Sequence, residues 1–356
     1  MKELLKRLPS GLASTLRDGL HTAEDLARAA SVWKYEALSL PAPAGVEGRV
    51  AWLGRRDSTT AAELAFGATG PVFPGFVGAV KVTEFPTPGA LRVPTLVRLI
   101  IDLHGTLDDV LARASHGVWR LAKPLADRAR VTPVTSPEEI DRVEAELLRP
   151  YAARHGAQAH HVPLERVRAL AHEGGLVSIS VDGEEVAARL GYEFVREGKR
   201  CYAAWRFGYP ARVFDDPARY GAMNGLNTLL AIRHAHDGGY AVLDFGLSPA
   251  TPVENGQLQF KRLRGAAVST VECHAFFSLK VPPARAPDFF WARPVFSVDH
   301  GALVLNVGVP SALADRELLD RVHKKLVFKG VAKLRLHAAR PIDPAVIREL
   351  GAVELV

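Results

Sequence analysis

Hydrophobic and polar positions alternate most regularly between residues 176 and 210, and this pattern predicts a meander of strands. The segments 176–183 and 184–198 have the character of two strands joined at Asp182-Gly183, a dipeptide that favours a hairpin turn. A third strand is predicted over 199–210. These three strands would form one continuous antiparallel layer.

A helix and a further strand follow the meander. After a loop over 211–225, the pattern predicts a helix of about three turns over 226–239, ending at Gly238-Gly239, since glycine readily adopts the left-handed conformation that ends helices. Residues 240–246 form an apolar run typical of a buried strand, and 267–280 are predicted as one final strand. A meander, a helix and a parallel return predict an α/β fold with a mixed sheet.

The chain before the meander has similar signals. Residues 97–103 have the mostly apolar character of a buried strand, which leads into a predicted helix. A short strand is predicted over 131–135. Ser136 is a favoured residue at a helix start and Pro137 suits the first helical position, so a helix should begin there.

Proline-rich stretches divide the chain into three parts. We predict an N-terminal region over 1–125, a clear α/β unit over 126–282 and a shorter α/β tail over 283–356. The tail would complete a second lobe together with the N-terminal region.

Length and composition are those of a globular protein with two domains. The chain has 356 residues, of which 48% are hydrophobic and 24% charged. Two cysteines, Cys201 and Cys273, are too few for a disulfide framework. The first residues lack the apolar core of a signal peptide, and no run is long enough to span a membrane. We therefore expect a cytoplasmic protein.

The chain is basic, with a formal charge of +6 and a pI near 9.4. A solvated arginine-rich surface, common in bacterial proteins, explains this charge, and so does a face for an anionic partner such as a phosphorylated cofactor or tRNA. Charge alone leaves both interpretations open. Basic residues gather in one short stretch, at Arg113, Arg120, Lys123, Arg128 and Arg130.

An ordered set of motifs over 224–266 resembles the FemAB-like branch of the GNAT superfamily. A helix ends in glycine, a strand ends in Asp-Phe-Gly at 244–246, and Phe260-Lys261 follows with Gly265 close behind. Residues 99–123 and 184–209 look like the elements that precede this set in the family. The resemblance covers about 97–280, and it implies a GNAT-like fold in two lobes, of which the second lobe is degenerate.

The resemblance also implies a function. Such proteins move an acyl group from a thioester or an aminoacyl-tRNA ester to an amine. The main hypothesis is N-acyl transfer from an acyl-CoA-like co-substrate to a small-molecule or peptide-like amine. An aminoacyl-tRNA-dependent, amide-forming transferase and an inactive GNAT-fold scaffold are the alternatives. No permanently bound cofactor is expected.

Acyl transfer needs few protein groups. The attacking amine must lose a proton, and the carbonyl oxygen becomes an oxyanion that needs donors or a cation. By resemblance, Lys261 is implied to stabilise charge near the reacting carbonyl. Its alternative is a surface lysine whose stem packs on apolar neighbours. Asp244 ends a buried strand, where it could orient the amine or accept its proton; its alternative is a turn cap.

Further candidates lie on either side of the predicted helix. The stretch before it is the nearest match to a GNAT cofactor cradle, since a helix start with small residues binds anions; the alternative for Asn224 is a plain helix cap. The proposed cofactor-binding residues there are Tyr220, Gly221, Asn224 and Gly225. The proposed substrate-binding residues are Arg206, Tyr209, Arg262 and Arg264. Edge packing and solvated charge are the alternatives for these four.

Other chemistries find no support in the sequence. His155, His160 and His161 cluster, but no carboxylate or cysteine completes a metal-ligand spacing, so no metal is predicted. No nucleophile elbow, P-loop or dinucleotide fingerprint is present.

Overall fold

The computed structural model describes residues 35–41, 49–55, 80–83, 88–155, 162–251, 253–269 and 276–356. It is a mixed α/β protein that divides into two compact units. Unit 1 comprises residues up to 97, 248–259 and 270–356, and unit 2 comprises 98–247 and 260–269. The expected central domain of 126–282 therefore differs from unit 2, which begins earlier and omits most of 248–282.

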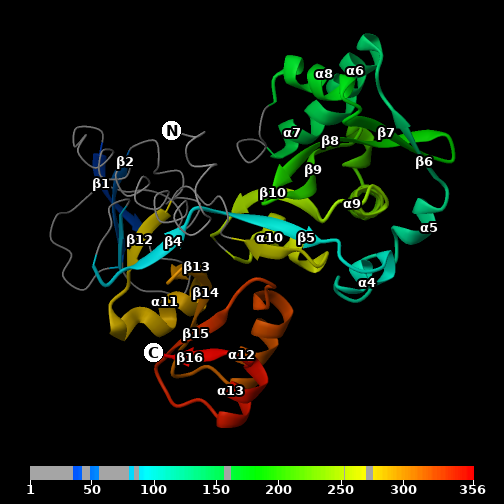
Figure 1. Cartoon of the computed structure of the whole chain (residues 1–356). Coiled ribbons are helices and arrows are strands. Elements are labelled where there is room, and N and C mark those ends of the chain that lie inside the picture. The colour runs from blue at the N-terminus through cyan, green and yellow to red at the C-terminus, as the bar shows by residue number, and fades with distance from the viewer. Residues whose placement is uncertain are drawn as a thin grey trace. The chain divides into compact units, whose positions relative to one another are not determined.

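Unit 2 is built on a seven-stranded sheet with the order β11-β5-β10-β9-β8-β7-β6 (Figure 1). The strands are β5 (Leu96–Asp102), β6 (Ala129–Pro133), β7 (Leu176–Val181), β8 (Glu184–Arg196), β9 (Lys199–Gly208), β10 (Val242–Pro249) and β11 (Ala267–Ser269). The strands predicted near 97–103 and 131–135 are thus present, on either side of the meander.

The predicted meander is confirmed. Strands β7, β8 and β9 pair antiparallel in sequence order. Asp182 and Gly183 have φ values of 52° and 84°, and Glu197 and Gly198 have 49° and 74°. Two successive positive φ values are those of the hairpin turn that matches the twist of its strands, so both turns form as the local sequence predicts.

The predicted parallel return is also confirmed, and its pairing is short. Strand β10 runs parallel to β9, with Val242 opposite Cys201 and Asp244 opposite Ala203. The pairing between β9 and β10 ends at Asp244 and Ala203, although both strands continue for several residues. The two strands therefore separate just after Asp244.

One long helical segment packs on strands β8 and β9 of the meander. It consists of α6 (Pro137–Val143), a π-helical turn η3 (Glu144–Leu148) and α7 (Arg149–His155). Ser136 caps it by accepting from the Glu139 N–H, with Pro137 at the first position, as predicted. The core beneath contains side chains of α8 (Leu164–His172), including Val167 and Leu170.

Helix α9 (Pro217–Asp237) corrects the expected helix boundary. It is 21 residues long and starts at Pro217 rather than near Leu226. Asp216 caps it by accepting from the Ala218 N–H, and proline at the first helical position strengthens this start signal. The expected loop over 217–225 is therefore helical.

The expected final strand over 267–280 is wrong. Its ends belong to two strands in different sheets, because β11 pairs with β5 in unit 2 while β12 (Phe276–Lys280) pairs with β3 and β4 in unit 1. Residues 270–275, which include Cys273, lie outside the described residues, as do His160 and His161.

Unit 1 contains two further sheets. One has the order β1-β2-β3-β12-β4, and the other has the order β13-β14-β15-β16, with β14, β15 and β16 parallel. Their strands are β1 (Tyr35–Pro41), β2 (Arg49–Arg55), β3 (Val80–Thr83), β4 (Leu91–Pro94), β13 (Val295–Asp299), β14 (Ala302–Val309), β15 (Lys333–Ala338) and β16 (Val353–Leu355).

Short helices complete the described chain. They are α4 (Leu107–Ala112), α5 (Lys123–Ala126), α10 (Gly256–Leu263), α11 (Ala286–Ala292), α12 (Asp315–Arg321) and α13 (Pro344–Leu350). Within the described ranges, none of the helices combines the length and the apolar character needed to span a bilayer.

Candidate functional site

Lys261 lies on α10 with 7% of its surface exposed. Its Nζ donates to the carbonyl oxygens of Phe245 at 2.7 Å and Leu247 at 3.2 Å. Both residues lie within the three positions after Asp244, the last residue of β10 that pairs with β9. The amine is therefore fixed where the two central strands separate, and the interpretation of Lys261 as a solvated surface lysine is wrong.

Burial changes the acid–base behaviour of this amine. Desolvation of the ammonium lowers the pKa of Lys261 from 10.5 to about 7; a nearby carboxylate, Asp244, raises it and Arg98 lowers it. An amine with a pKa near 7 exchanges its proton at neutral pH. It can donate a hydrogen bond as an ammonium and accept a proton as a free amine.

Asp244 is 1% exposed and holds two cations. Its Oδ2 accepts from Arg98 Nη1 at 2.6 Å and from Arg196 Nη2 at 3.0 Å, and its Oδ1 accepts from the Gly246 N–H at 2.6 Å. The bond to Gly246 is the turn cap that the sequence allowed. Through these contacts the carboxylate of Asp244 holds the guanidinium groups of Arg98 and Arg196 beside the last pair between β9 and β10.

Arg98 and Arg196 are not among the residues that the sequence motifs predict for the site. Arg98 is the single charged residue inside the apolar run 97–101, and a lone charge in a buried strand was a usable signal. Arg196 follows an exposed part of the hairpin and has no comparable signal. With Lys261, these residues place two or three positive charges around the one carboxylate of Asp244.

A second buried polar cluster joins β9 to α9. The hydroxyl of Tyr209, which is fully buried, donates to Asn224 Oδ1 at 3.0 Å, and Asn224 Nδ2 lies 3.5 Å from the Tyr220 hydroxyl. Desolvation raises the pKa of Tyr209 well above its usual value. The Arg264 guanidinium stacks 3.4 Å from the Phe260 ring centroid, and burial lowers its pKa to about 10, against the raising effect of Tyr209 and Tyr220.

The predicted cofactor cradle is not a helix start. The four proposed residues, Tyr220, Gly221, Asn224 and Gly225, lie inside α9, where backbone N–H groups are used by the helix itself. Tyr220 already donates its N–H to the Asp216 carbonyl at 2.8 Å. Gly221 is exposed, and Gly225 packs near Ala122 and Arg264. This segment therefore offers no free N–H groups of a helix start to an anion.

The four proposed substrate-binding residues do not form one group. Arg206 is 8% exposed and donates to the Leu148 carbonyl at 3.3 Å, so it contacts η3, whereas the hydroxyl of Tyr209 contacts α9. Desolvation lowers the pKa of Arg206, with Glu144 opposing. Arg262 is half-buried, and burial lowers its pKa. Of the four, Arg264 and Tyr209 belong to the same cluster.

Metal-ligating side chains do not converge among the residues whose placement is described: no group of three or more His, Cys, Asp or Glu could hold an ion there. Cys201 is a buried thiol whose pKa is raised by desolvation.

Comparison with known proteins gives similarity in structure alone. No family model and no curated protein matches the sequence. A crystal structure of FemX is similar at 14% identity and a TM-score of 0.39, covering 52% of this chain and 61% of that one. L-PGS from Bacillus licheniformis is similar at 13% identity and a TM-score of 0.32, covering 58% and 65%.

A GCN5-related N-acetyltransferase from Anabaena variabilis is similar at 10% identity and a TM-score of 0.28, covering 85% of both chains. The chain resembles FemX and GNAT structures. This chain spans less than two thirds of the FemX and L-PGS chains. With TM-scores below 0.5, the roles proposed for its residues rest on their own contacts.

Proposed function

We propose that this chain is an N-acyltransferase that moves an acyl group from an acyl-CoA-like thioester to an amine. The observation that supports it is Lys261, a buried amine with a pKa near 7 at the point where β9 and β10 separate. Asp244 lies inside β10 and does not end it as expected, but ligands in α/β sheets commonly bind in a crevice between neighbouring strands, and Lys261 lies where β9 and β10 separate.

Lys261 would act on the reacting carbonyl. Attack by the amine turns the thioester carbonyl into an oxyanion, and a preorganised donor in a site shielded from water stabilises that charge. As the tetrahedral species collapses, the thiolate leaves and the amide forms. An amine that titrates near neutral pH can also take the proton that the acceptor nitrogen releases.

Asp244 would act through its neighbours. Its carboxylate fixes Arg98 and Arg196, and Arg98 is close enough to Lys261 to lower the pKa of that amine. A positive environment suits a developing oxyanion and a phosphorylated donor alike. This is a positioning role, and it replaces proton acceptance as the role we propose for Asp244.

The alternative donor is an aminoacyl-tRNA. The charge of +6 and the pI near 9.4 favour it, because tRNA is a polyanion. The acyl chemistry at Lys261 would be the same, with the tRNA ribose hydroxyl as leaving group. Both donors are cytoplasmic molecules, so we propose a cytoplasmic location. A scaffold that keeps the fold without activity is the third possibility.

The melting temperature of the full chain distinguishes the donors. The protein is mixed separately with acetyl-CoA, alanyl-tRNA and uncharged tRNA, at low and raised salt. A stabilisation by acetyl-CoA alone is expected. Stabilisation by alanyl-tRNA beyond that of uncharged tRNA would favour the alternative donor, and no shift with any of them would contradict both enzymatic proposals.

A further inference from the structure

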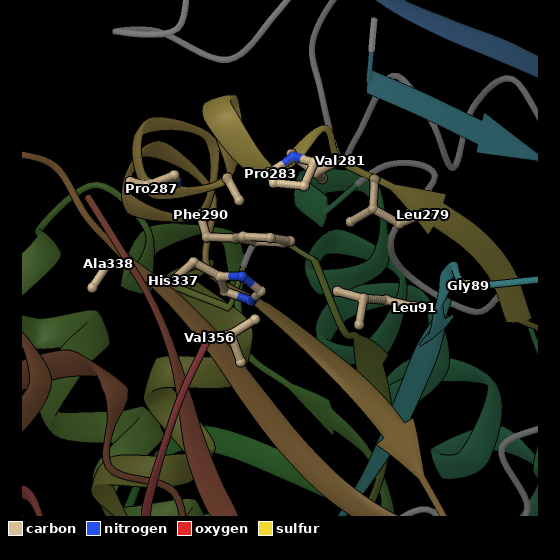
Figure 2. A pocket seen from close by; sticks show the side chains of 11 residues that line it. Gly89, Leu91, Leu279, Val281, Pro283, Pro287, Phe290, His337, Ala338 and Val356 are labelled. Atoms are coloured by element: carbon tan, nitrogen blue, oxygen red, sulfur yellow. The ribbon is translucent and has the colours of Figure 1, made fainter. Parts of the chain in front are cut away.

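Unit 1 contains a cavity of about 200 Å³. Its wall comes from β4, β12, α11 and β15, and most of it is apolar. Figure 2 shows Leu91, Leu279, Val281 and Phe290 arranged around the open space, with His337 among them. Of the described residues that line the cavity, His337 alone has a hydrogen-bonding side chain.

The imidazole of His337 is held in one orientation. It is 8% exposed and stacks on the Phe290 ring with a centroid separation of 4.2 Å and an interplanar angle of 29°. Its Nε2 lies 3.1 Å from Asn306 Oδ1. A ring fixed on two sides presents its remaining edge with a defined direction.

The neighbours of Asn306 determine the tautomer. Its Nδ2 lies 3.3 Å from the Val295 carbonyl oxygen, which can only accept, and 2.8 Å from Ser297 Oγ. The atom that faces His337 is therefore the amide oxygen, an acceptor, so Nε2 carries the proton and donates. Nδ1 is then an acceptor, and it receives no hydrogen bond from the described residues.

The side chains that line the cavity carry no charge at neutral pH. Burial lowers the pKa of His337 to about 4, with Arg335 lowering it further and Glu354 opposing, so the ring is neutral at pH 7. The guanidinium of Arg335 pairs with Asp299 at 2.6 Å and with Glu354 at 3.0 Å. An ionised ligand would therefore find no counter-charge among the side chains that line the cavity to offset the hydration that it loses.

We propose that this cavity binds a small, uncharged and largely apolar molecule that donates one hydrogen bond to His337 Nδ1. An apolar cavity of roughly 150 Å³ holds benzene, so this volume suits a phenol-sized ring with a short substituent. The site lies in unit 1, so it is separate from the proposed acyl-transfer site, and it stands or falls independently of that function.

Three matched probes test the proposal on the full chain with carbon-13 methyl labels. They are p-cresol, which donates one hydrogen bond, toluene, which has the same shape without a donor, and phenylacetate, which is charged. Shifts confined to methyl groups that line the cavity, such as those of Leu91, Leu279, Val281 and Val356, are expected with p-cresol. One hydrogen bond should make p-cresol bind about 3–10-fold more tightly than toluene.

Two variants separate the hydrogen bond from the volume. His337→Phe keeps a ring against Phe290 and should make p-cresol and toluene bind equally, while Ala286→Leu fills the cavity from α11 and should abolish both. The proposal is overturned if none of the probes shifts these methyl groups in the wild type, if toluene binds as tightly as p-cresol, or if phenylacetate binds best. These three outcomes are measured on the wild-type protein, so the test does not depend on whether either variant folds.

Discussion

Replacing Lys261 with methionine should change how stability depends on pH. In the unfolded chain this lysine keeps its proton up to its ordinary pKa of 10.5, whereas in the folded chain burial lowers the pKa to about 7. Between these two values the unfolded state binds more protons than the folded state. The free energy of unfolding contributed by Lys261 therefore rises with pH across this window.

The size of the effect follows from the width of the window. Each pH unit within it changes the free energy of unfolding by up to ~1.4 kcal/mol. Since the folded-state titration begins near pH 7, the gain between pH 7 and pH 9 is about 2 kcal/mol. Methionine fills a similar volume and does not titrate, so the variant loses this gain.

The assay is urea unfolding of the wild type and of Lys261→Met at pH 7 and pH 9. The stability of the wild type relative to the variant should increase by about 2 kcal/mol at the higher pH. Lys123→Met, at an exposed position of α5, is the matched control and should follow the wild type at both pH values. Equal pH dependence in the wild type and Lys261→Met would refute the desolvation of this amine.

Three further substitutions test the surroundings of the site by denaturant unfolding. Asp244→Asn should cost about 3–5 kcal/mol, because it leaves two guanidinium groups without their carboxylate, and an unchanged midpoint would show that the ion pairs are dispensable. Gly191→Ala should cost about 1–3 kcal/mol, since an added Cβ would lie 2.2 Å from the Tyr202 hydroxyl; wild-type stability would contradict this packing. Tyr209→Phe should cost about 1–3 kcal/mol by removing the buried donor to Asn224, and a neutral result would mean that water replaces it.

Local signals were sufficient for much of unit 2. The turns at Asp182-Gly183 and Glu197-Gly198 and the cap at Ser136 depend on residues that are close in sequence. Strand β10 is indicated by its own apolar run, although its partner β9 lies well before it in the chain. The residue types at these turns, at this cap and along this apolar run are themselves the signal. The meander and the strand that carries Asp244 could therefore be predicted from the sequence.

The start of α9 shows how two local signals compete. Asp216-Pro217 is a strong start, but the expected loop extended to residue 225 and the expected helix began at Leu226. A Cβ added at Gly225 would meet Ala122 and Arg264 at ordinary van der Waals distances of 3.4 and 4.0 Å, so the packing there does not require glycine. Sequence pattern alone does not distinguish a glycine that bends the chain from one that lies inside a helix.

The ion pairs at the site were beyond sequence reasoning. Arg98 and Asp244 are 146 positions apart, and Arg196 and Asp244 are 48 apart. Tertiary folding brings them together, so no spacing rule within an element predicts the pairing. The burial of Lys261 was equally hidden, because its neighbours in sequence suit an exposed helix.

The rate of acyl transfer in Lys261→Met, compared with Lys123→Met, tests the proposed site most directly. The donor that stabilises the protein is supplied at saturation with a panel of amines, and amide formation is followed by mass spectrometry. Loss of a group that stabilises the oxyanion predicts a fall of about 100- to 1000-fold in kcat, with donor stabilisation retained. Equal rates in the two variants would contradict a role for Lys261 in the reaction.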